Sequence, residues 1–170
     1  MILWGNCQKN SAHIKQRFED IHGPIETDSS GKPHFVSKKF HLSISHDGDL
    51  TAGVLSSHPI GIDIVQLPIA ATFSDSELKL LYKTTSEIKE SDQAAFWAAR
   101  EAYIKCHGHS LDEPLEIEAN DYTSPVLPQM GTPMIVNGHK CFLFHVSSGY
   151  LGAIIAHDQN EAHRVLNTLV

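Results

Sequence analysis

The sequence predicts an α+β fold in which antiparallel strands pack on a long helix. Apolar and polar residues alternate over much of residues 40–65, which is the period of half-buried strands. Between residues 74 and 108 the apolar spacing becomes that of a helix, and Asn137-Gly138 later joins two apolar runs as the turn of a hairpin. Strands, then helices, then strands again exclude the regular strand–helix alternation of a parallel sheet.

The first part of the chain is predicted to contain a short helix, a loop and three strands. Residues 8–22 place Ile14, Phe18 and Ile21 at helical spacing, which predicts one apolar helix face. Residues 23–33 are rich in Gly, Pro, Asp and Ser and are predicted to be a loop. We expect the strands to form a compact β-meander, at residues 40–45, 51–57 and 60–65.

The rest of the chain is predicted to contain two helices followed by strands. Ser74 and Asp75 are suited to cap a helix that carries Leu78, Leu81 and Tyr82. The next helix, residues 93–107, is rich in Ala, has no internal Gly or Pro, and ends before Gly108. The last strands are expected at residues 115–119, 133–146 and 150–157.

Composition excludes several classes of protein. The 170 residues suit one domain, or two small lobes that share a core. With 13 Lys and Arg against 20 Asp and Glu, the net charge of −7 argues against a nucleic-acid partner. The sequence predicts neither a membrane span nor a signal peptide. The cysteines are three in number, widely spaced and without a CxxC pair, which argues against a disulfide framework or a cysteine zinc site and favours a reducing cytoplasm. They are Cys7, Cys106 and Cys141.

Two groups of charged residues are candidates for chemistry. Asp63 interrupts the apolar strand GIDIV, where a carboxylate costs free energy unless a hard cation or an Arg meets it. Trp97, Glu101 and Lys105 follow at intervals of four and share one helix face. Each group alone also has a simpler interpretation: Asp63 as a cap at the edge of a strand, and Glu101–Lys105 as a surface ion pair.

A third group is a cationic stretch in an otherwise acidic chain. Residues 31–46 hold no acidic residue, and the stretch is suited either to phosphate binding or to a solvated loop. Its basic and titratable residues are Lys32, His34, Lys38, Lys39, His41 and His46. The pair His107 and His109 is a weak zinc signal without a third ligand, and only His46 among the histidines is expected to be functional.

The order of these motifs resembles that of the 4′-phosphopantetheinyl transferases, which use coenzyme A to convert apo carrier proteins to their holo form. The matching elements cover about residues 31–156. They are Gly31-Lys32-Pro33, Ser45-His46, Gly61-Ile62-Asp63-Ile64 and the helix segment WAAREAYIK at residues 97–105. The resemblance implies that family's α+β fold, with antiparallel sheets packed on the long helix.

The resemblance also implies a role for each matching residue. Asp63 and Glu101 would hold Mg²⁺, and Lys105 would contact the pyrophosphate of coenzyme A. Glu101 would in addition take the proton from the carrier serine. Lys32, Ser45 and His46 match coenzyme A-binding positions, with Lys32 and His46 at the 3′-phosphate end. The implied partner is an apo acyl or peptidyl carrier protein, which we expect to dock on residues 78–89.

Two departures from the family pattern qualify these expectations. Many larger, single-chain members have Glu at the position of Val65, so we expect one protein ligand fewer and a water in its place. The length lies between those of the one-lobe and two-lobe members, which predicts a reduced N-terminal lobe at residues 1–58 and a full lobe at 59–170. A second subunit, in a homo-oligomer, could complete the nucleotide site.

Two other functions stay open on the sequence alone. One is a non-catalytic relative that binds coenzyme A or the carrier as a partner subunit. The other is an unrelated metal-dependent phosphoesterase that uses Asp63 and Glu101.

Overall fold

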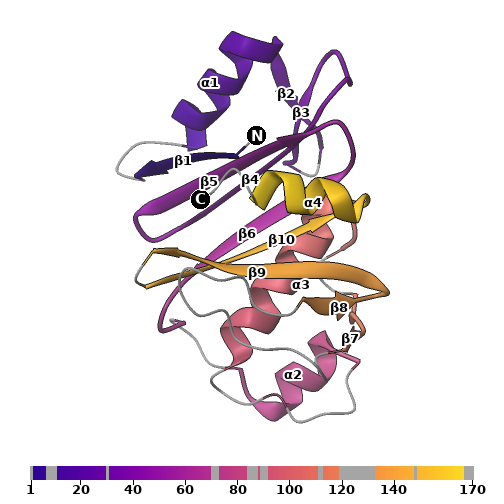
Figure 1. Cartoon of the computed structure of the whole chain (residues 1–170). Coiled ribbons are helices and arrows are strands. Elements are labelled where there is room, and N and C mark those ends of the chain that lie inside the picture. Colours follow the sequence, from indigo (N-terminus) through magenta and orange to yellow (C-terminus); the bar gives the residue numbers. More distant parts are fainter. Residues whose placement is uncertain are drawn as a thin grey trace.

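A small N-terminal sheet and one helix form the first layer of the molecule (Figure 1). The computed structural model describes residues 2–6, 11–29, 31–69, 73–83, 88, 92–110, 113–118, 133–147 and 149–166. The antiparallel sheet has the order β1-β5-β4, and α1 packs on it through Ile14 and Phe18. The elements are β1 (Ile2–Asn6), α1 (Ser11–His22), β2 (Ile25–Thr27), β3 (Pro33–Phe35), β4 (His41–Asp47) and β5 (Leu50–Ser56).

A five-stranded antiparallel sheet forms the centre of the molecule, with strand order β6-β10-β9-β8-β7. Helices α2 and α3 pack on one face of it through the largest apolar cluster, whereas α4 and β5 cover the other face through a second cluster. The strands are β6 (Ile60–Gln66), β7 (Ile117–Glu118), β8 (Met134–Val136), β9 (His139–Ser147) and β10 (Tyr150–Ala156). The helices are α2 (Asp75–Leu81), α3 (Gln93–His107) and α4 (Gln159–Leu166).

The α+β fold with antiparallel sheets is confirmed, and so are the local signals for helix ends and for the hairpin. Ser74 and Glu77 form a reciprocal capping box at the start of α2. Gly108 ends α3 in the left-handed conformation, with φ of 75°. Asn137 and Gly138 both have positive φ, as the tight turn between β8 and β9 requires.

The predicted β-meander is wrong, because β6 pairs with β10 and not with β5. Strands β4 and β6 instead lie at the facing edges of the two sheets. Side chains of β4 accept hydrogen bonds from backbone N–H groups of β6 that no strand pairs. Ser43 accepts a hydrogen bond from the Ile62 amide, and Ser45 accepts one from the Ile64 amide. A sheet edge with unpaired amides is thereby satisfied without a shared strand ladder.

Other expectations for the first part of the chain also need correction. The segment predicted as a loop, residues 23–33, contains β2 and the start of β3, which form a short hairpin. Ile21 is 61% exposed, so only Ile14 and Phe18 of the predicted helix face are buried. Strand β1 and helix α4 had no counterpart in the sequence prediction. Among the described residues, no helix is long and apolar enough to cross a membrane.

Candidate functional site

The centre of the candidate site is a three-residue contact where β4, β6 and α3 meet. Asp63 on β6 is only 5% exposed and points toward α3. Its Oδ1 atom accepts a hydrogen bond from the Ser45 hydroxyl and one from the Lys105 ammonium, each at 2.6 Å. The Lys105 ammonium also donates to Ser45 Oγ at 3.0 Å. Within the described residues, the positive group that meets Asp63 is therefore Lys105, and not the Arg considered from sequence.

Neither simpler interpretation of these acidic residues holds in the structure. Asp63 lies within a buried strand and does not cap its edge. The ammonium of Lys105 pairs with Asp63, 42 residues away, and no ion pair joins it to Glu101 in the described structure. The i,i+4 spacing on α3 thus places a carboxylate and a cation on one face, but the cation reaches across to β6.

Glu101 lies one turn before Lys105 and faces the same region. Its Oε1 atom is buried and has no hydrogen-bond partner among the described residues. Burial raises the pKa of Glu101, the nearby charge of Asp63 raises it further, and the charges of Lys105 and Arg100 oppose the rise. Burial also raises the pKa of Asp63, against the opposing effects of Lys105 and Ser45.

Two clefts open on this centre, and Glu101 and Lys105 line both of them. The larger cleft, of about 730 Å³, is lined by residues of β4 and β6 that include the polar side chains of His46 and Asp63. An apolar wall of the same cleft includes Ile69, Phe73 and Trp97, and the last two rings stack at 5.1 Å. Of this wall only Trp97 was expected from the helix spacing, because Ile69 and Phe73 come from the segment between β6 and α2.

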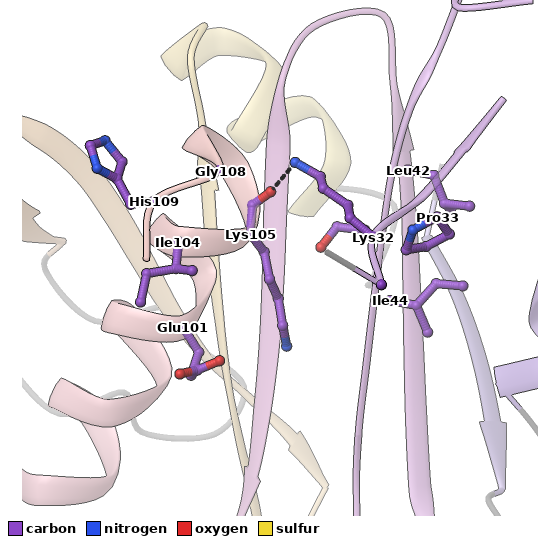
Figure 2. A pocket seen from close by; sticks show the side chains of 11 residues that line it. Lys32, Pro33, Leu42, Ile44, Glu101, Ile104, Lys105, Gly108 and His109 are labelled. Carbon is purple, nitrogen blue, oxygen red and sulfur yellow. Dashed lines mark hydrogen bonds between the residues drawn. The ribbon is translucent and has the colours of Figure 1, made fainter. Parts of the chain in front are cut away.

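The smaller cleft, of about 410 Å³, is bounded by the end of α3 and by the segment that leads into β3 (Figure 2). Lys32 extends from that segment and donates a hydrogen bond to the backbone carbonyl of Lys105 at 2.6 Å. A lysine is well placed there, because carbonyls in the last turn of a helix lack partners within the helix and carry partial negative charge.

All six sequence-predicted residues therefore lie around one centre, each lining at least one of the two clefts. They are Lys32, Ser45, His46, Asp63, Glu101 and Lys105. The other lysines of the cationic stretch, Lys38 and Lys39, are exposed and line neither cleft. The predicted division between residues 58 and 59 runs through this arrangement, since Lys32, Ser45 and His46 precede it.

The acidic pair fits a small divalent cation that keeps several waters. Mg²⁺ needs only one or two protein carboxylates when water and phosphate oxygens complete its shell. Asp63 and Glu101 supply these two, and the unpartnered Oε1 atom of Glu101 is an oxygen for which the described protein offers no donor. Val65 lines the same cleft with an apolar side chain. The described residues contain no cluster of three or more His, Cys, Asp or Glu side chains, so any cation here would depend on these two carboxylates.

The histidines near the end of α3 form an aromatic cluster with Tyr103. His107 stacks on the Tyr103 ring at 4.4 Å and lies 4.5 Å from the ring of His139. The ring of His109 also stacks on Tyr103, at 5.3 Å, and the ring of His157 lies 6.3 Å from that of His139. Burial lowers the pKa of His107, and the charges of His139, His109 and His157 lower it further.

Acidification is expected to destabilise the protein through His107. Because its folded-state pKa lies below the ordinary value of about 6.5, the unfolded chain takes up the proton first, and stability falls as pH drops below that value. Urea unfolding at pH 7.5 and at pH 5.5 measures the loss. Between pH 7.5 and pH 5.5, the His107→Gln variant should lose less of its free energy of unfolding than the wild type. The control variant His13→Gln, at an exposed residue, should lose as much as the wild type. An equal loss in all three proteins would contradict this role.

Together, the fold and the site define an α+β protein whose two sheets meet beside a cleft with paired carboxylates and lysines. The sequence model of the 4′-phosphopantetheinyl transferase superfamily matches residues 59–150, which is more than half of the chain. The chain therefore belongs to the 4′-phosphopantetheinyl transferase superfamily.

Individual relatives support this assignment at modest identity. The 4′-phosphopantetheinyl transferase psf-1 of Bacillus pumilus is 34% identical over 94 residues, which are 51% of this chain and 40% of the relative. The transferase ffp of Bacillus subtilis is 30% identical over 129 residues, 68% of this chain and 54% of the relative. The transferase Sfp of Bacillus subtilis (strain 168) is 28% identical over 144 residues, 78% of this chain and 62% of the relative. The chain spans about half the length of the curated relatives it matches.

Proposed function

We propose that the chain transfers 4′-phosphopantetheine from coenzyme A to a serine of an apo acyl or peptidyl carrier protein. The observation that carries this proposal is the convergence of Asp63, Glu101 and Lys105 beside two connected clefts, in a member of the transferase superfamily. A buried and a partly buried carboxylate next to a lysine suit a polyphosphate substrate that arrives with a divalent cation. The names of the relatives agree with this activity.

Asp63 and Glu101 would hold Mg²⁺. When bound, Mg²⁺ supplies positive charge that offsets the charge developing on the phosphoanhydride oxygens. Lys105 reaches the same region from α3 and would contact the pyrophosphate. Lys32, which lines the smaller cleft, and His46, which lines the larger, would bind the 3′-phosphate end of the nucleotide. Ser45, which also lines the larger cleft, would contribute to coenzyme A binding.

Glu101 would act as the base in the transfer. Its carboxylate lies beside Lys105 and lines both clefts, where a serine hydroxyl at the substrate phosphates could reach it. It would take the proton of the carrier serine hydroxyl, directly or through a water. The serine oxygen would then form a bond to the β-phosphorus of coenzyme A, the bond from that phosphorus to the bridging oxygen would break, and adenosine 3′,5′-bisphosphate would leave.

The carrier is proposed to dock on α2 and the segment that follows it. Leu80 on α2 is 72% exposed, and Lys79 and Lys83 beside it are exposed as well. An apolar side chain flanked by lysines suits an acidic carrier, although the chain has a net charge of −7. Lys89, the third lysine of the predicted docking segment, lies outside the described residues.

The proposal also covers the division into lobes, the location in the cell and the oligomeric state. Residues 1–58 and 59–170 would act as a reduced and a full lobe, the first giving Lys32, Ser45 and His46 and the second the acidic pair. A cytoplasmic location agrees with Cys106 and Cys141, both of which are free and buried. The proposal extends to a homo-oligomer in which a second copy completes the nucleotide site, and it predicts a solution mass that is a multiple of that of one chain.

The proposal predicts a mass gain of one phosphopantetheine group on an apo carrier. Purified chain, Mg²⁺, coenzyme A and a panel of apo acyl and peptidyl carriers are incubated, and each carrier is then weighed by mass spectrometry. The same reaction without Mg²⁺ serves as the control. No mass gain on any carrier, from a folded preparation, would sink the proposal. Calorimetric binding of coenzyme A or carrier without turnover would instead favour the non-catalytic relative, and release of inorganic phosphate would favour a phosphoesterase.

A further inference from the structure

The ammonium group of Lys105 forms an ion pair with Asp63, one of the two carboxylates proposed to hold the metal. Its Nζ atom is 2.6 Å from Asp63 Oδ1, and the Ser45 hydroxyl occupies a second position on the same oxygen. One carboxylate oxygen offers about two lone-pair directions, and here both are used by these donors. A cation that bonds to Oδ1 must therefore displace one of them.

The charges around Asp63 show why Lys105 is the group held there. A carboxylate as buried as Asp63 is costly unless a positive charge meets it. In the described structure Lys105 is the cation that does so, and two carboxylates, Asp63 and Glu101, face this one ammonium. Mg²⁺ on the same carboxylates would leave the ammonium without its counter-ion and close to a second cation.

Lys105 is also able to leave. Its side chain is 28% exposed, whereas that of Asp63 is 7% exposed, and it lines both clefts. A Lys side chain is a compact charge on a flexible four-carbon stem, so its head can move while its backbone stays fixed. The backbone is fixed here, because the Lys105 carbonyl accepts the hydrogen bond from Lys32.

We propose that Lys105 is the internal counter-ion of Asp63 before a divalent cation binds, and that cation binding releases its ammonium into the clefts, toward the substrate phosphates. This inference rests on the metal site of the proposed function. It makes the two events cooperative: a phosphate ligand that holds Lys105 strengthens Mg²⁺ binding, and Mg²⁺ strengthens phosphate binding by the same factor.

The first test is calorimetric titration of the full chain with MgCl₂ in the absence of coenzyme A. Since Mg²⁺ need not displace an ammonium in Lys105→Met, this variant should bind Mg²⁺ about tenfold more tightly than the wild type. The matched control is Lys39→Met, which removes a positive charge at an exposed residue that lines neither cleft. Its Mg²⁺ affinity should stay within about threefold of the wild type, because screened charges at a distance contribute little.

The second test uses the wild-type chain, so it does not depend on the folding of a variant. An acetylating reagent is applied briefly with and without Mg²⁺, and modification of each lysine is measured by peptide mass spectrometry. Lys105 should react several-fold faster with Mg²⁺ present, while the exposed Lys83 should react at an unchanged rate and serves as the internal reference.

The outcomes separate this inference from the proposed function. Tighter Mg²⁺ binding by Lys105→Met, together with faster acetylation of Lys105 in the wild type, supports the exchange. Equal or weaker binding by the variant, or acetylation that Mg²⁺ leaves unchanged or slows, overturns the exchange and leaves the metal site standing. Absence of Mg²⁺ binding by both proteins overturns the exchange and the metal site together. A failed carrier assay alongside a positive exchange would overturn only the transfer activity.

Discussion

Replacement of Glu101 by Gln is expected to reduce the proposed carrier modification by at least about 10³-fold, because one change removes both the proposed proton acceptor and a proposed metal ligand. Gln keeps the shape of the side chain, so the packing of α3 is retained. The initial rate of phosphopantetheine transfer, followed by mass spectrometry of the carrier, measures the loss. Mg²⁺ affinity, measured by calorimetry, should fall in the same variant.

The same substitution should not lower the free energy of unfolding. A carboxyl whose pKa is raised in the folded state is harder to ionise there than in the unfolded chain, so its charge at neutral pH costs stability. A neutral Gln removes this cost. The control is Glu118→Gln, at an exposed residue on β7 that lines neither cleft. Turnover by Glu101→Gln at the rate of this control would refute the role of Glu101.

The elements predicted best from sequence are those whose ends and faces are set locally. Helix α3 combines a run of good helix formers with Gly108, whose left-handed conformation ends it. The turn at Asn137-Gly138 depends on positive φ at two adjacent residues, which few other residue pairs favour. Nothing outside these segments is needed to predict them.

Pairing between strands was not predictable in the same way. Alternation indicates that residues 60–65 form a strand, but carries no information on its neighbour. The alternation near residue 43 is also misleading, because Ser43 and Ser45 are buried and bond the backbone of β6. The sequence pattern predicts that these serines face solvent, whereas their hydroxyls form hydrogen bonds that join the two sheets.

The candidate site shows the same division between local pattern and tertiary contact. Its residues were predictable, because four motifs occur in one order and share the residue types of a known family. The contacts among them were not, since the partner of Lys105 is Asp63 on another element and not its helical neighbour Glu101. The distance between α3 and β6 decides this, and no spacing along the sequence reports that distance.

Gly61 controls that distance, and its replacement by Ala is expected to have the largest effect on stability. A Cβ atom at residue 61 would lie 1.9 Å from the backbone oxygen of Ala102 and 2.7 Å from the amide nitrogen of Cys106. Backbone atoms of a helix cannot turn aside as a side chain does, so α3 must move away from β6. We expect a loss of about 3 kcal/mol or more in the free energy of unfolding, measured with urea.

Displacement of α3 would also carry Glu101 and Lys105 away from Asp63, so Gly61→Ala should lose transfer activity even in the fraction that stays folded. The matched control is Gly53→Ala on β5, where the new Cβ would meet side-chain atoms of Ile14 and Phe18. These side chains can adjust, so the control should lose less stability and keep its activity per folded molecule. Because the obstacle in α3 is backbone, adding Ala102→Gly to Gly61→Ala should restore neither stability nor activity. Recovery in that double variant would show that side-chain volume, and not the approach of the two backbones, makes glycine necessary beside α3.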